Sequence, residues 1–170
     1  MKMTSAYANK MLKQLGDEKD YWVNKENTSA VYTVAVGETP VIPEYDYAEV
    51  ATKIAELDYK VTIIKHAINL ANVTNMISVA EEEFSVDTIL IRMAQLNKRK
   101  AFLDMLRKNQ EKSRKEPNYF SGRSASPEYQ YINYDLEMVK QDFEKVSQEI
   151  MEMQMALDKY NQTFEFEVEI

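Results

Sequence analysis

Apolar residues recur at alternating spacings of four and three along two long segments of the chain. This spacing has a period of 3.5 residues, which is typical of helices that pack as coiled coils. We therefore predict long helices over residues 46–75 and 133–161, with Asp46 and Asn133 at their N-caps. Because both segments carry a regular seam, we expect the two seams to pair. The seam residues are Val50, Ile54, Leu57, Val61, Ile64, Ile68 and Ala71 in the first segment and Leu136, Val139, Phe143, Val146, Ile150, Met153, Leu157 and Tyr160 in the second.

Less regular patterns predict two further helices and three short strands. Apolar stripes over residues 4–24 and 85–115 favour helices. Residues 30–36 are rich in β-branched and aromatic side chains, which favour a strand. Residues 129–132 and 163–170 alternate between two kinds of side chain, as strands with two different faces do. We expect the first and last of these strands to form one small sheet, which the 129–132 strand could join.

The composition fits one domain over residues 1–170, because single cores usually occupy about 100–200 residues. Only three Gly and four Pro are present, which leaves little material for a turn-rich β fold. We predict a mainly α fold, a bundle of long antiparallel coiled-coil-like helices with a small accessory β-sheet. Helices this long in a small chain expose apolar surface unless a second copy covers it, so we also predict a homo-oligomer.

The chain contains no Cys, which excludes disulfides, thiolate metal sites and Cys nucleophiles. Its N-terminus has no apolar run long enough for a signal-peptide core, and no stretch approaches the roughly 20 apolar residues that span a bilayer. We therefore expect a cytoplasmic protein with no membrane partner.

Catalytic and cofactor chemistry is not apparent in the sequence. His66 is the only histidine, so a zinc site built on several His is excluded, and we expect this side chain to be solvated or at an interface. A di-iron bundle would need Glu-x-x-His, but Ile63 stands three residues before His66. Residues 81–83 are three Glu without the alternating ligands of a calcium loop. We predict no catalytic, cofactor or metal site, and a protein that is not an enzyme.

A basic segment, residues 98–123, carries nine Lys or Arg and three Asp or Glu, whereas the chain from Asp135 onward carries three and ten. We expect these two segments to neutralise each other, and no nucleic-acid partner. The alternative is that cations and interleaved rings in a mobile loop at 116–128 and its flanks hold phosphates and stack bases. The residues of this candidate patch over 107–123 are Arg107, Lys108, Lys112, Arg114, Lys115, Tyr119, Phe120 and Arg123.

Asn69, Asn72 and Asn75 follow one another at three-residue spacing on one flank of the predicted 46–75 helix. Amides at the end of a seam commonly set the register between helices. We therefore predict a polar interface here, with binding of a polar ligand as the alternative.

The order of segments resembles a known family. Gly37-Glu38-Thr39-Pro40 form a Gly-Glu-x-Pro turn, Ile68-Asn69 with Asn72 or Asn75 end a helix, and Tyr134-Asp135 lead into the last helix. These motifs are similar to those of bacterial helical proteins of unknown function, some of whose members are labelled septicolysins. The resemblance spans nearly the whole chain and implies a helical fold, with no activity attached.

The sequence therefore predicts a non-enzymatic, oligomeric helical scaffold or protein-interaction module, whose protein partner is not identified. Two alternatives remain open. The first is a prefoldin-like chaperone or holder, since helices joined to a small sheet can build a clasp. The second is nucleic-acid binding through the basic 107–123 segment.

Overall fold

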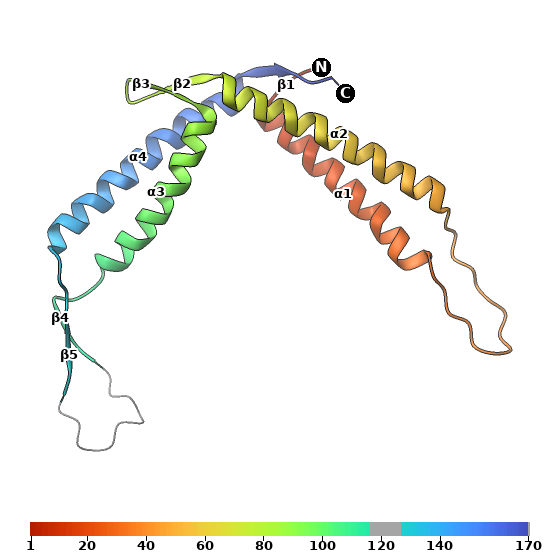
Figure 1. Cartoon of the computed structure of the whole chain (residues 1–170), viewed down its shortest axis with the longest axis horizontal. Coiled ribbons are helices and arrows are strands. Elements are labelled where there is room, and N and C mark those ends of the chain that lie inside the picture. The colour runs from red at the N-terminus through yellow and green to blue at the C-terminus, as the bar shows by residue number, and fades with distance from the viewer. Residues whose placement is uncertain (116–126, 170) are drawn as a thin grey trace. The chain divides into compact units, whose positions relative to one another are not determined.

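Long helices dominate the structure. It is a computed structural model and describes residues 1–115 and 127–169. Within these residues four helices and three two-stranded sheets are present (Figure 1). The prediction of a mainly helical fold with a small amount of β-structure is therefore confirmed. The helices are α1 (Ser5–Ser29), α2 (Tyr47–Thr74), α3 (Val86–Leu106) and α4 (Leu136–Thr163).

The chain divides into two units, each with its own contacts. The first unit contains Met1–Ile77, Ser85–Asp87 and Leu157–Ile170, and the second contains Ser78–Phe84 and Thr88–Ala156. Compact units of this kind also occur within single domains, so one domain over residues 1–170 stays a prediction.

The α2 seam packs against α1, the helix that precedes it in the sequence. In the first unit α2 packs along α1, and in the second unit α4 runs beside α3 (Figure 1), where Arg92 of α3 pairs with Glu149 of α4. The prediction that the seams of 46–75 and 133–161 pair with each other is therefore wrong. Elements that follow one another in the sequence usually lie next to one another in space, and the observed pairing follows that preference.

Side-chain caps fix where the helices begin. The Asp46 carboxylate accepts hydrogen bonds from the backbone N–H groups of Ala48 (2.8 Å) and Glu49 (3.2 Å), which confirms the predicted N-cap of α2. At the start of α4, Asp135 accepts the equivalent bonds from Glu137 and Met138. The predicted cap at Asn133 is wrong because the carboxylate of Asp135 lies within reach of the free amides of the first turn.

The predicted helix 85–115 ends early, at Leu106. Its apolar stripe stops there, and the polar residues that follow offer no face for a helix to bury. Instead β4 (Lys112–Arg114) pairs antiparallel with β5 (Tyr129–Tyr131). The strand predicted at 129–132 is thus present, but its partner is a segment that we predicted to be helical.

The terminal strand has a different partner from the predicted one. β6 (Glu165–Glu167) pairs antiparallel with β1 (Lys2–Thr4), and α4 extends to Thr163, so the strand is shorter than the predicted 163–170. The strand predicted at 30–36 is wrong: these residues form an exposed connection between α1 and α2. Its β-branched side chains favour a strand only where a neighbouring strand is available, and in Figure 1 the connection lies at the opposite end of the α1–α2 pair from β6.

The connection turns at Gly37, whose φ of +90° is strained for any residue with a Cβ. A second turn joins β2 (Met76–Val79) and β3 (Glu82–Ser85) through Ala80 and Glu81, both with positive φ. Such turns usually carry Asn-Gly, so the sequence gives no signal for this hairpin.

The core of the first unit lies where α1, α2 and the β1–β6 sheet meet. The α2 seam is buried at seven-residue intervals, at Val50, Leu57, Ile64 and Ala71. The buried cluster consists of Met3, Ala8, Leu15, Leu57, Ile64 and Val168. In the second unit the side chains of Ile89, Leu103, Val139 and Met153 are buried. In each unit, buried side chains on one face of a helix therefore form part of the core.

Candidate functional site

A groove of about 670 Å³ lies in the first unit, between the C-terminal part of α2 and the segment that contains β6. Both sides belong to this unit. It is lined by Tyr59, Thr62, Ile63, His66, Ala67, Leu70, Ala71, Thr74 and Asn75 from α2 and its end, and by Phe164, Glu165, Phe166, Glu167, Val168 and Glu169.

The floor of the groove is a second apolar face of α2. Tyr59, Ile63, Ala67 and Leu70 are spaced by four, four and three residues, so they share a face that is distinct from the seam. Tyr59 is 69% exposed and Leu70 57% exposed. Apolar side chains of this size are therefore available to a ligand or to another chain.

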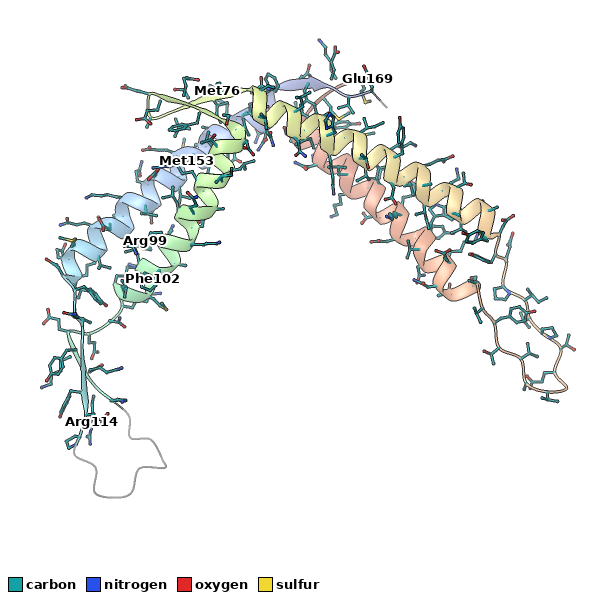
Figure 2. All side chains as sticks on the ribbon, viewed as in Figure 1. Met76, Arg99, Phe102, Arg114, Met153 and Glu169 are labelled. Atoms are coloured by element: carbon teal, nitrogen blue, oxygen red, sulfur yellow. The ribbon has the colours of Figure 1, made fainter. Side chains whose placement is uncertain are left out.

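The wall of the groove is an edge of β6 and its flanks. Successive side chains of a strand point to opposite faces, so a groove lined by six consecutive residues borders the strand's edge. Met1 and Val168 exchange two backbone hydrogen bonds, of 2.7 and 2.8 Å, on the β1 side. In an antiparallel ladder the alternate residues then turn their N–H and C=O groups to the other side. These are Glu165, Glu167 and Glu169, and Figure 2 shows Glu169 just beyond β6.

A buried tyrosine contacts two of the residues that line the groove near the end of α2. The Tyr160 hydroxyl donates to the carbonyl oxygen of Ala71 (3.4 Å), and its ring stacks on Phe164 with centroids 4.9 Å apart. Burial raises the pKa of Tyr160 above its ordinary value, and a hydrogen bond with Asn75 opposes that shift. Asn75 also donates from its side chain to the Ala71 carbonyl (2.7 Å). These contacts hold the groove's end in place.

The three asparagines predicted to form a polar interface do not come together at this groove. Asn75 lines it and hydrogen-bonds to its own helix end. Asn69 is exposed and Asn72 is half-buried, and neither lines the groove. His66 lines the groove with an exposed side chain.

The basic segment is placed partly on α3 and partly on the β4–β5 hairpin. Arg107 and Lys108 both form ion pairs with Asp104, with 2.6 Å between the Arg107 guanidinium and the carboxylate. Hydrogen bonds from Lys108 and Arg107 hold the pKa of Asp104 below its ordinary value. Lys115 pairs with Glu128 at 2.8 Å, which lowers the pKa of Glu128 and raises that of Lys115.

Ring contacts occupy further cations of this segment. Lys112 lies over the rings of Tyr129 and Tyr131, at 4.4 and 5.5 Å from their centroids, and the Arg107 guanidinium lies 4.0 Å from the centroid of Phe143. Arg114 lies on the hairpin (Figure 2). The remaining patch residues, Tyr119, Phe120 and Arg123, lie outside the described residues. Four of the predicted phosphate-binding cations therefore have partners within the chain.

A second exposed apolar face lies on α3, and sequence reasoning missed it. The α3 outer face comprises Leu90, Ile91, Ala94, Ala101, Phe102 and Met105, all exposed. Its signal is a second set of four- and three-residue spacings, offset from the buried or half-buried stripe of Ile89, Met93, Leu96, Leu103 and Leu106. Figure 2 labels Arg99 and Phe102 on α3. The guanidinium of Arg99 lies 5.8 Å from the ring centroid of Phe102.

Among residues 1–115 and 127–169, no group of three or more His, Asp or Glu side chains is arranged to hold a metal ion. In the same part of the chain, no helix is both long and apolar enough to cross a membrane.

Comparisons with known proteins show the fold alone. No family model matches the chain, and no curated protein matches it significantly. The structure is similar to the crystal structure of a functionally unknown conserved protein from Corynebacterium diphtheriae, with a TM-score of 0.68 at 14% sequence identity. The alignment covers 98% of this chain and 100% of that chain. The whole fold is therefore similar to that of a protein that itself has no assigned activity.

Proposed function

We propose that the protein is a non-enzymatic, self-associating helical scaffold that binds a helix of a protein partner on the α3 outer face. The observation that carries this proposal is the uncovered apolar surface of that face. Ile91 is 55% exposed and Met105 is 61% exposed. Monomeric proteins rarely leave such a stripe open to water, and contiguous apolar patches mark interaction sites.

The spacing of the face suits a helix as the occupant. Ile91, Ala94, Lys98, Ala101 and Met105 follow spacings of three, four, three and four, the pattern of a coiled-coil seam. The face extends about 22 Å along α3 at 1.5 Å per residue, or four turns of a partner helix. Its two alanines allow close approach of the two helix backbones.

Lys98 in the middle of the face sets a condition on the partner. A single polar residue in an apolar seam fixes the register of the helices, at a cost in stability. An ammonium group enclosed between helices needs an opposite charge. The partner helix should therefore carry an Asp or Glu opposite Lys98 and apolar residues on either side.

The test compares matched double variants of the tagged full-length protein. Ile91→Glu/Met105→Glu places two charges fourteen residues apart on the α3 outer face. The control, Tyr7→Glu/Tyr21→Glu, makes the same charge change at the same spacing on exposed positions of α1. Far-UV circular dichroism checks that both variants fold.

The proposal expects proteins that co-purify with the wild type and the control but not with the α3 variant. Equal recovery by all three would overturn the role of this face. Light scattering on the purified wild type tests self-association. A protein that stays monomeric up to about 100 µM would overturn the proposed self-association. Nucleic acid in the same fractions would favour the basic 107–123 segment as the binding site instead.

A further inference from the structure

The α1–α2 connection exposes a segment that is built like a strand but is not paired. Residues 30–36 read Ala-Val-Tyr-Thr-Val-Ala-Val, and Val31 and Val36 are almost completely exposed. Three valines, one threonine and one tyrosine in seven residues favour a sheet. The same unit contains an unpaired strand edge, that of β6 at the groove. We propose that in a dimer residues 30–36 of each copy pair with the β6 edge of the other copy, inside the groove. This inference rests on the proposed self-association and names its contact.

The segment cannot reach the groove of its own chain. Ala67, midway along the groove's α2 side, is twenty residues from the start of α2 at Tyr47, or about 30 Å. Thr33 is four residues beyond the end of α1 at Ser29, which allows a reach of about 14 Å. Only another molecule can therefore bring the two elements together.

A two-fold axis satisfies both contacts at once. When two α1–α2 pairs lie side by side in opposite directions, the connection of each copy meets the groove of the other. The distance between connection and groove is the same in both copies, so neither contact needs a change in the helices. Such an isologous arrangement is the commonest form of homodimer.

The side chains match on both faces of the added strand. Tyr32, Val34 and Val36 alternate with Val31, Thr33 and Ala35. With the first set turned toward α2, the rings and methyl groups cover the exposed floor at Tyr59 and Leu70. The second set then lies beside the β6 carboxylates and is uncharged.

The carboxylates also exclude competing pairings. Glu165, Glu167 and Glu169 share one face, and like charges opposite each other destabilise a ladder. Pairing of one β6 strand with the β6 strand of another copy is therefore disfavoured. A strand without charged side chains, such as residues 30–36, meets no such repulsion.

The interface has the size of a stable one. The seven residues of the segment and the thirteen groove-lining residues that are not already buried, all but Ala71 and Val168, give twenty on each copy. Specific interfaces that bury about 1,600 Å² contain roughly 20–30 residues a side. The contact is thus large enough to hold a dimer without any other surface.

Cross-linking tests the contact directly, because the chain has no native Cys. Two full-length single variants, Val34→Cys and Leu70→Cys, are oxidised separately and as a mixture. The proposal expects a disulfide-linked dimer on a non-reducing gel in the mixture and not in either variant alone. If light scattering shows that the wild type is a dimer but the mixture of variants forms no cross-link, the proposed contact is overturned and self-association is left intact. A monomeric wild type overturns self-association itself.

A charge exchange gives a second readout that does not depend on disulfide geometry. Thr33→Glu adds a carboxylate beside Glu167 at each of the two contacts of the dimer. The dissociation constant should rise about tenfold for every 1.4 kcal/mol of repulsion, and Glu167→Lys in the same chain should restore it. If Thr33→Glu leaves the dissociation constant unchanged, or Glu167→Lys fails to restore it, residues 30–36 do not lie at the β6 edge.

Discussion

Ile64 has no exposed surface and lies in the core that α2 shares with α1 and the β1–β6 sheet. Its replacement by Ala removes three carbons and leaves a cavity, since helix backbones can close such a gap only in part. We predict that Ile64→Ala lowers the free energy of unfolding by about 2–5 kcal/mol. Urea unfolding followed by circular dichroism measures this difference.

The control is the same substitution at an exposed isoleucine. Ile42 is 65% exposed in the α1–α2 connection, and Ile42→Ala should change the free energy of unfolding by less than about 0.5 kcal/mol. Equal losses in the two variants would contradict the assignment of Ile64 to the core.

Single residues could be placed from the sequence where one periodic stripe decides their environment. The seven-residue interval of Val50, Leu57, Ile64 and Ala71 predicts their burial, and all four are buried. The apolar residues of α2 that form the floor of the groove were not predicted. Tyr59, Ile63 and Leu70 belong to a second stripe on the same helix, and a helix that is apolar on two sides gives a weak periodic signal.

At the scale of elements, the N-cap of α2 offers a clean test. The Asp46 carboxylate accepts two backbone hydrogen bonds at the helix start. Asp46→Ala leaves both amides without this acceptor, so we predict a loss of about 0.5–2 kcal/mol in the free energy of unfolding. Asp46→Asn keeps the acceptor oxygen and should retain most of the stability. A similar loss in both variants would show that charge and not the cap stabilises this end.

The elements that the sequence misplaced are those whose state depends on a partner. Residues 30–36 have the composition of a strand, but the strands that the structure describes in their unit lie at the far end of the α1–α2 pair. Residues 112–114 were predicted as the end of the 85–115 helix, yet they pair with Tyr129–Tyr131, whose rings lie under Lys112. Local propensity is a weak guide where a long-range contact decides.

At the scale of the whole molecule, the fold is retained at an identity where few side chains are shared. The protein from Corynebacterium diphtheriae has 14% identical residues over nearly the entire chain. A fold of this kind needs apolar residues at seam positions more than it needs particular ones, because repacked cores of similar volume tolerate extensive substitution. The surface residues that would determine a partner are under no such constraint, so function has to be argued from this chain's own exposed faces.

Self-association makes thermal stability depend on protein concentration, and this is the prediction that belongs to the molecule as a whole. If the folded state is a dimer and the unfolded state a monomer, dilution favours unfolding by mass action. We predict that the unfolding midpoint rises by about 3–5 °C when the protein concentration is raised a hundredfold. Val34→Glu/Val36→Glu puts charges on the α2 side of the proposed strand, so its midpoint should be lower and nearly independent of concentration. Circular dichroism melts at several concentrations measure both slopes. A flat wild-type midpoint would contradict the dimer, whereas parallel slopes for wild type and variant would place the dimer contact outside residues 30–36.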